Sequence, residues 1–324
     1  MNFAKITQAA HYTPQQVVTN DDLAKIMDTN DEWIASRTGI KSRHITYDEN
    51  TSDLSAKVVE SLLEKSGKSA EEIDFLIIAT ISPDSLMPTT ATITQAKTGL
   101  INAFAFDMQA ACSGFVYALA MGEKLISSGR YQNGIIIGAE THSKTLNWAD
   151  RTTAVLFGDG AGGVLLESSQ TQHFLAEKLQ SDGVKASSLT SRKYYPNSPY
   201  SKIYEAESNL VMDGRLVFDF AVREVPKNIL ATLKIANLEA DDIDYYLPHQ
   251  ANLRIIDKWP RKIKAQPAKF LVNLQHYGNT SAASIPILLS ENIDKQILKF
   301  GSNQKVLMTG FGGGLTWGSI LVKL

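Results

Sequence analysis

Residues 103–119, AFAFDMQAACSGFVYAL, hold the only cysteine of the 324-residue chain between an apolar run and a helical pattern. The run Ala103–Met108 predicts a buried strand, and the pattern after Cys112 predicts a helix Phe115–Ser128 with Gly129 as its cap. A helix N-terminus stabilises a nearby anion by ~0.3–2 kcal/mol, so we expect a lowered pKa and a partly ionised Cys112 thiol. Taken alone, a single cysteine is more often an inert buried side chain, but the position of Cys112 at a helix start argues against that interpretation.

The same alternation of apolar runs and helical patterns extends outward in both directions. Further strands are predicted at Ile73–Ala79, Gly134–Gly138 and Lys305–Thr309, and further helices at Asp53–Ser66 and Val222–Ile235. Continuous apolar runs between helices are typical of sheets that helices cover on both faces. The chain is therefore expected to have an α/β fold.

Two pairs of similar segments indicate an internal duplication. Ser69–Ile78 (SAEEIDFLII) is similar to Glu239–Pro248 (EADDIDYYLP). Residues 154–167 (AVLFGDGAGGVLLE) and 305–324 (KVLMTGFGGGLTWGSILVKL) each predict a strand, a glycine turn and a second strand. Windows this short also match by chance. If the duplication is real, the chain divides into halves 1–170 and 171–324 with an active site between them.

Residues Gly158–Gly163 read GDGAGG and match the dinucleotide pattern G-x-G-x-x-G. A true dinucleotide site opens a helix, whereas VLLE, a strand, follows here. We therefore expect these glycines to supply the positive φ of a tight hairpin. Walker A, HExxH and GxSxG sequences are absent, which removes the usual support for nucleotide-triphosphate, zinc-peptidase and α/β-hydrolase chemistry.

Composition excludes several other classes of protein. Hydrophobic residues make up 44% and charged residues 20%, as in ordinary folded domains. A net charge of -2 gives no electrostatic case for nucleic acid or an anionic membrane, and no apolar run approaches a membrane span. The first residues lack a signal-peptide pattern, so a cytoplasmic location is expected. One cysteine excludes intrachain disulfides and Cys-rich zinc sites, and no metal is expected.

Two other polar side chains stand where a strand meets a helix. His249 lies in YYLPHQANLRII (245–256) and Asn279 in NLQHYGNTSAASIP (273–286). Alone, His249 is explained equally well as a surface residue and Asn279 as part of a turn. Together with Cys112 they form a set with the residue types of nucleophilic catalysis. The remaining histidines are interpreted as structural, and these are His11, His44, His142, His173 and His276.

Six segments, in order, resemble the β-ketoacyl-acyl-carrier-protein synthase III family, which initiates bacterial fatty-acid synthesis. They are DEWIASRTGIKSRHI (31–45), AACSGF (110–115), DRTTAVLFGDGAGG (150–163), PHQANLRI (248–255), YGNTSAAS (277–284) and FGGGLTWGS (311–319). The resemblance implies a five-layered αβαβα thiolase-like fold built from two duplicated halves, and a homodimer. Thiolases use a second cysteine, and elongating synthases place a second histidine where this chain has Asn279. The Cys-His-Asn set thus points to the initiating type.

The resemblance also implies roles for these residues. Cys112 would carry the acyl group, and His249 with Asn279 would serve decarboxylation of a malonyl group, because neutral donors can stabilise an enolate oxygen. The backbone N–H groups of Cys112 and Gly313 would form the oxyanion hole. The expected reaction joins an acetyl-CoA or short branched acyl-CoA primer to malonyl-acyl-carrier protein, with acyl-CoA as substrate and no cofactor. A relative that primes polyketide or signalling-molecule synthesis, and a non-catalytic scaffold, remain alternatives.

Substrate contacts follow from the same resemblance. The coenzyme A contacts would be Thr29, Trp33, Arg37, Arg151, Gly214 and Asn252. The carrier-protein contacts would be Gln250, Ala251, Asn252, Leu253 and Arg254. The acyl pocket would include Phe311. Met87 would lie across the subunit interface, at the end of the acyl pocket of the other subunit. For Trp33 the alternative is a core aromatic residue, and for Met87 it is simple packing in the dimer interface.

A basic run continues beyond the predicted docking segment and would suit an acidic carrier protein. It comprises Arg254, Lys258, Arg261, Lys262, Lys264 and Lys269, interrupted by Asp257. A solvated helix face explains such a run equally well. Trp259-Pro260 falls where the family usually continues a helix, so we expect a break there.

Overall fold

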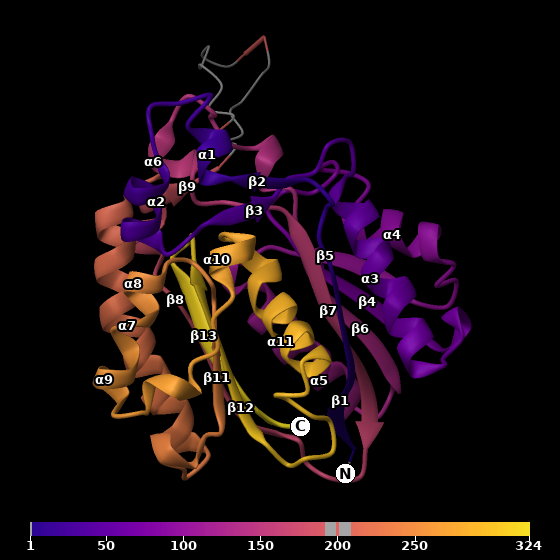
Figure 1. Cartoon of the computed structure of the whole chain (residues 1–324). Coiled ribbons are helices and arrows are strands. Elements are labelled where there is room, and N and C mark those ends of the chain that lie inside the picture. Colours follow the sequence, from indigo (N-terminus) through magenta and orange to yellow (C-terminus); the bar gives the residue numbers. More distant parts are fainter. Residues whose placement is uncertain (1, 192–198, 201–208) are drawn as a thin grey trace.

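Two large β-sheets and three layers of helices form the framework of the protein, as the computed structural model of residues 2–191, 199–200 and 209–324 shows (Figure 1). The first sheet has the strand order β1 (Phe3–Tyr12), β7 (Gly160–Ser169), β6 (Asn133–Glu140), β4 (Phe75–Ala79) and β5 (Phe104–Met108). The second sheet has the order β8 (Phe174–Ser181), β13 (Thr316–Lys323), β12 (Lys305–Gly312) and β11 (Tyr245–Pro248).

The two sheets repeat one topology. In the first, β4 pairs in parallel with β6, which pairs antiparallel with β7, which pairs antiparallel with β1. In the second, β11, β12, β13 and β8 have the same relations in the same order. The similar segments at Ser69–Ile78 and Glu239–Pro248 lead into β4 and β11, each through a short 3-10 turn. The expected duplicated α/β fold is confirmed, while a division at residue 170 stays a prediction.

Helices fill the outer layers and the space between the sheets. The outer face of the first sheet is covered by α3 (Thr51–Ser66) and α4 (Thr90–Thr98), and that of the second by α7 (Gly214–Ile235) (Figure 1). Between the sheets lie α5 (Gly114–Ser127) and α11 (Ser284–Asp294). Their buried side chains join both sheets in one core cluster, so neither sheet has a solvent-exposed inner face.

Shorter elements surround the top of this framework and its second outer face. The helices among them are α1 (Asn20–Leu23), α2 (Asp31–Thr38), α6 (Arg151–Ala154), α8 (Leu253–Ile256), α9 (Trp259–Ile263) and α10 (Leu274–Tyr277). The strands are β2 (Val17–Thr19), β3 (Ser42–His44), β9 (Leu189–Thr190) and β10 (Val211–Met212). Within the described part of the chain, no helix is both long and apolar enough to cross a membrane.

The predicted strands and helices are present, and the largest difference in their bounds is at the start of α7. Helix α7 begins at Gly214 and not at Val222, because the Asp213 side chain accepts hydrogen bonds from the N–H groups of Arg215 and Leu216. This cap satisfies two backbone donors of the first turn. The helix therefore begins about two turns before the apolar pattern that predicted it.

The hairpin predicted at residues 154–167 is wrong. Ala154 ends α6, and the glycines from Gly160 onward lie inside β7, without positive φ. Their function is close packing: a Cβ on Gly162 would lie 2.6 Å from the backbone nitrogen of Ile287. The glycine run thus lets α11 lie directly on the first sheet.

This contact predicts the effect of a methyl group at position 162. Gly162→Ala forces α11 away from β7, since the atoms it meets are backbone, and we expect unfolding to become easier by about 1–3 kcal/mol. Gly183→Ala is the matched control, because a Cβ there has no heavy atom within 4 Å among the described residues. It should change stability by less than about 0.5 kcal/mol. Denaturant unfolding of both variants measures the difference, and equal midpoints would contradict it.

Candidate active site

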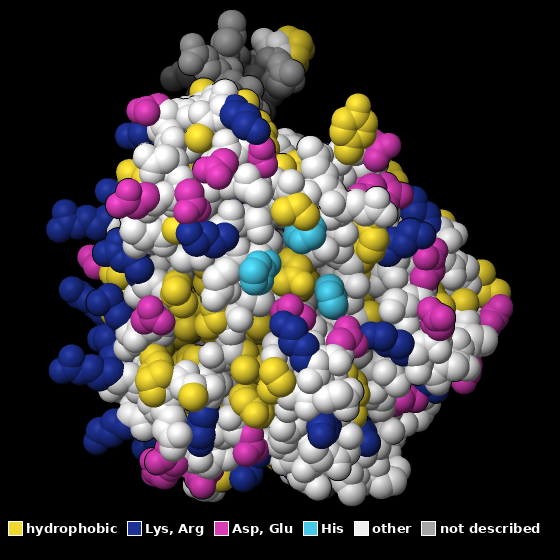
Figure 2. Space-filling model, in the orientation of Figure 1, with side chains coloured by type: hydrophobic (Ala, Val, Ile, Leu, Met, Phe, Trp, Pro, Cys, Tyr) yellow, Lys and Arg dark blue, Asp and Glu magenta, His cyan; other side chains and the backbone are white. Residues whose placement is uncertain are grey.

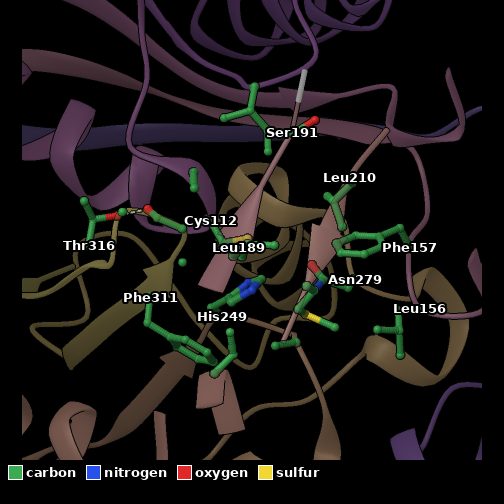
Figure 3. Close-up of a pocket in the computed structure, with 18 of the residues that line it drawn as sticks. Cys112, Leu156, Phe157, Leu189, Ser191, Leu210, His249, Asn279, Phe311 and Thr316 are labelled. Carbon is green, nitrogen blue, oxygen red and sulfur yellow. Dashed lines mark hydrogen bonds between the residues drawn. The ribbon is translucent and has the colours of Figure 1, made fainter. Parts of the chain in front are cut away.

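A cavity of about 480 Å³ opens between the two halves. Cys112, His249 and Asn279 all line it, and their side chains point into it from different segments (Figure 3). Its volume is in the range that small-molecule sites use. The structure therefore brings together the three residues that the sequence predicted to act as a set.

Cys112 lies in a 3-10 turn, Ala111–Ser113, between the end of β5 and the start of α5. The turn is sharp, with Ala111 in the left-handed region at φ 46°. Gly312 at the end of β12 packs directly against it: a Cβ there would lie 2.6 Å from the Cys112 backbone nitrogen. Gly313 follows and also lines the cavity. Glycine is required at position 312 because any side chain would displace the turn that holds Cys112.

Burial raises the pKa of the Cys112 thiol to about 12. A hydrogen bond from Ser281 opposes the rise, and the nearby Glu140 carboxyl adds to it. The expected lowered pKa is therefore wrong for the free site. Removing the sulfur from water disfavours its anion more than the helix N-terminus favours it.

His249 follows Pro248, the last residue of β11, and is 1% exposed. Its Nδ1 lies 2.7 Å from Ser284 Oγ, which in turn accepts a hydrogen bond from the Gln250 N–H at 3.3 Å. We assign the Ser284 hydroxyl hydrogen to Nδ1, so that Nε2 carries the imidazole proton. Burial lowers the His249 pKa to about 3, with a smaller effect from His142. His249 is thus a neutral donor at neutral pH.

Asn279 is oriented in a similar way. Its Oδ1 accepts a hydrogen bond from the Ser281 N–H at 2.8 Å, which leaves the Nδ2 amide group as the donor that can act in the cavity. Ser281 also donates through its hydroxyl to Glu140, a buried carboxyl whose pKa burial raises to about 7. His249 and Asn279 therefore supply uncharged N–H groups to the same cavity.

Phe311 and Met87 differ in their placement. Phe311 lines the cavity, with its ring centroid 5.2 Å from that of His249 in an edge-on arrangement. Met87 is 87% exposed and lies outside the cavity lining of its own chain. Its predicted place in a partner's pocket stays a prediction.

The predicted coenzyme A contacts separate into two groups. Two guanidinium groups lie over the Trp33 ring, that of Arg37 at 4.7 Å and that of Arg151 at 5.2 Å from its centroid. Arg151 also donates to the Asp28 carboxylate at 3.0 Å. Thr29 lies in the loop before α2, and the other two residues, Gly214 and Asn252, line the cavity. Trp33 is half-buried and packs against a core cluster, so its contact with coenzyme A stays a prediction.

The predicted carrier-protein segment needs one correction. Gln250 is 1% exposed, and its Oε1 accepts from the N–H groups of Asn273 and Leu274. Its side chain is therefore closed to a partner, and we remove it from the docking surface. Ala251 and Leu253 are half-buried, whereas Arg254 is exposed.

Most of the basic run is exposed on the face that α8 and α9 form. Figure 2 shows Lys and Arg side chains projecting along the flank of the molecule where α7, α8 and α9 lie. Lys269 is the exception, because it is half-buried and its Nζ donates a hydrogen bond to the Asp241 carbonyl. The expected break is confirmed, since α8 ends at Ile256 and a new helix begins at Trp259. Pro260 stands in its first turn, where a missing N–H costs no helical bond.

His142 is a cavity residue that the sequence interpretation missed. It follows the end of β6, lines the cavity, and has its ring centroid 4.8 Å from that of Phe157. The predicted strand ended at Gly138, whereas β6 continues to Glu140. His142 therefore has the strand-end position that singled out His249, and the extra strand residues hid it.

Comparison with known proteins gives one consistent result. Models of 3-oxoacyl-[acyl-carrier-protein] synthase III match residues 106–183 and, for its C-terminal part, residues 233–324. The chain is 59% identical over its full length to the β-ketoacyl-[acyl-carrier-protein] synthase III of Streptococcus sanguinis, and both chains are covered completely. It is 60% identical to the Lactococcus lactis subsp. lactis protein of the same name, again with complete coverage of both.

A solved structure supports the same assignment. The 3-oxoacyl-[acyl-carrier-protein] synthase III of Aquifex aeolicus superposes with a TM-score of 0.92 at 39% identity, covering 99% of this chain and 100% of that one. The two-sheet framework, the cavity between the halves and the sequence matches all agree. The chain belongs to the 3-oxoacyl-[acyl-carrier-protein] synthase III family.

Proposed function

We propose that the chain joins an acyl-CoA primer to malonyl-acyl-carrier protein by a decarboxylative Claisen condensation, the initiating step of fatty-acid synthesis. One observation carries the proposal: the lone thiol and two neutral N–H donors line the same cavity. The products are a 3-oxoacyl-acyl-carrier protein, coenzyme A and carbon dioxide. Acetyl and short branched acyl groups are the proposed primers.

The first half-reaction uses Cys112. Its sulfur attacks the primer carbonyl, the bond from that carbon to the coenzyme A sulfur breaks, and the thiol proton leaves with coenzyme A. The backbone N–H groups of Cys112 and Gly313 would hold the transient oxyanion, and the glycines at 312 and 313 keep side chains out of this space. A raised thiol pKa keeps the sulfur protonated until a thioester arrives.

The second half-reaction uses His249 and Asn279. Loss of carbon dioxide from the malonyl group leaves an electron pair that forms an enolate, whose oxygen accepts hydrogen bonds from His249 Nε2–H and Asn279 Nδ2–H. The enolate carbon then attacks the acyl carbonyl, and the Cys112 thiolate leaves. Neutral donors suit this step because a charged imidazolium would be costly in so buried a place.

The substrate contacts are part of the proposal. Trp33 and Arg151 would hold the adenine of coenzyme A, which requires one guanidinium to leave the ring face that it now covers. Arg254 and the exposed Arg261 and Lys262 of α9 would attract the acidic carrier protein. The exposed pair Leu86 and Met87 would be covered in a homodimer, which explains two large apolar side chains in water. No cofactor is needed, and a cytoplasmic location fits both substrates.

Two alternatives have less support. An enzyme that primes polyketide or signalling-molecule synthesis would share the cavity, but the full-length relatives carry the name of the β-ketoacyl synthase. A scaffold without catalysis has no use for a thiol that faces a cavity beside two oriented donors.

The two half-reactions should separate by mutation. His249→Ala and Asn279→Ala are expected to lose at least about a hundredfold in malonyl decarboxylation, because each removes an oxyanion donor. Both should still gain an acetyl group on Cys112 from acetyl-CoA, which intact-protein mass spectrometry detects. Cys112→Ser should gain none while it keeps its fold. Loss of acetylation with decarboxylation retained in the two variants would reverse the proposed roles.

The raised pKa of the Cys112 thiol predicts how its reactivity in the free enzyme depends on pH. Iodoacetamide labelling of Cys112 should accelerate about tenfold per unit from about pH 7 to about pH 10, because the thiolate fraction keeps rising below its pKa. The denatured protein should level off near the ordinary thiol pKa of about 8.5. Since the chain has one cysteine, each modification reports on this site alone. A plateau near pH 8 in the native protein would show that the helix N-terminus outweighs burial.

Removing positive charges tests the proposed docking surface for the carrier protein. Arg254→Ala and Lys262→Ala are expected to raise the KM for malonyl-acyl-carrier protein several-fold at low salt, with the difference shrinking as salt screens the attraction. Lys57→Ala is the matched control, because Lys57 is equally charged and exposed but lies on α3, in the opposite outer layer. An equal rise in all three variants would argue for a general charge effect.

A further inference from the structure

His142 is a buried side chain whose polar atoms are unused. It is 1% exposed, and neither Nδ1 nor Nε2 has a hydrogen-bond partner among the described residues. The neighbouring Asp159 carboxylate is engaged elsewhere, by the Ser143 hydroxyl and by the N–H groups of Ser143 and Thr46. Buried polar groups without partners are rare in proteins, so a ligand that meets them is to be expected.

The imidazole is neutral and lies in an apolar wall. Burial lowers the His142 pKa to about 4, and a neutral ring has one N–H donor and one acceptor nitrogen. Around it, the cavity is lined by hydrocarbon and aromatic groups, among them Ile81, Phe157 and Leu210. This part of the wall thus adds a second polar position, besides Asn279, to a largely apolar surface.

The position of Phe157 relates His142 to the nucleophile. The Phe157 backbone bridges to Asn279, and its ring lies beside Asn279, across the cavity from Cys112 in Figure 3. His142 packs on that ring. An acyl group attached to the Cys112 sulfur extends away from it, so the far end of the chain, not the thioester, is the part that approaches this wall.

We propose that His142 is a specificity-determining residue of the acyl cavity, and that the enzyme prefers short primers with a hydroxyl or keto oxygen near their far end over hydrocarbon primers of the same shape. The inference rests on the proposed acyl transfer to Cys112. A hydrocarbon end leaves both imidazole nitrogens unsatisfied, whereas an oxygen pairs with one of them. Sites that hydrogen-bond a substrate reject analogues that lack the partner more strongly than apolar sites reject an added oxygen.

Isosteric acyl-CoA pairs test this preference. In 3-methylbutanoyl-CoA and 3-oxobutanoyl-CoA, and in 4-methylpentanoyl-CoA and 4-oxopentanoyl-CoA, a methyl group in one member replaces an oxygen in the other. The ratio of kcat/KM for Cys112 acylation within each pair, read by mass spectrometry, cancels any general change in rate. We expect the wild-type enzyme to favour the oxo member of at least one pair by about tenfold.

The variants at position 142 complete the experiment. His142→Leu should abolish or invert the preference, and His142→Asn, which keeps a donor and an acceptor, should retain its direction. His142→Leu should also be at least as stable as the wild type without ligand, because it removes two unsatisfied polar atoms. Ratios that are the same in the wild type and His142→Leu, or a marked loss of stability in that variant, would overturn the proposal.

Acetyl-CoA separates this failure from failure of the function itself. An acetyl group carries no oxygen beyond its thioester carbonyl, so acetylation of Cys112 in the wild type reports on acyl transfer alone. Acetylation without a preference for the oxo primers would contradict the proposed role of His142 but not the proposed function. Absence of acetylation would contradict both proposals.

Discussion

The contact between the turn Ala111–Ser113, which holds Cys112, and the end of β12 is the constraint on which the rest of the site depends. Gly312 lies so close to Cys112 that a Cβ would meet its backbone nitrogen at 2.6 Å. The two belong to different halves of the duplicated fold. This contact fixes the distance between the sheets at one end of the central layer, and that distance determines which side chains can enter the cavity from either half.

The two donors obtain their orientation from a single segment. Ser281 fixes the Asn279 amide, and Ser284, three residues later, fixes the His249 ring. Ser281 opens the 3-10 turn that leads into α11, and Ser284 is the first residue of α11, the helix that packs directly on the glycine run of β7. Donors that are held before the reaction need not reorganise as charge develops, and burial keeps the imidazole neutral for the same purpose. The glycine run that resembles a dinucleotide motif therefore serves the catalytic geometry.

The sequence predicted the fold and the central triad of residues because both leave local patterns. Apolar runs mark the strands, and Cys112, His249 and Asn279 each follow a recognisable junction. The prediction of a lowered thiol pKa was wrong because burial by β12 and by the 3-10 turn Ser281–Ala283 comes from residues far away in the chain. Gln250 was misassigned for the same reason, since its partners at positions 273 and 274 become neighbours only after folding. His142 was hidden by two additional strand residues.

Asn252 connects the regions that the two substrates are proposed to use. Its Oδ1 caps α8, which leads into the basic surface, while its Nδ2 donates to the Arg37 carbonyl beside Trp33. The same residue lines the cavity. The two proposed substrates are thioesters that would both have to reach Cys112 in the cavity that Asn252 lines, so coenzyme A would leave before the carrier protein delivers its malonyl group. A covalent bond to Cys112 resolves that conflict, because it retains the primer while one carrier replaces the other.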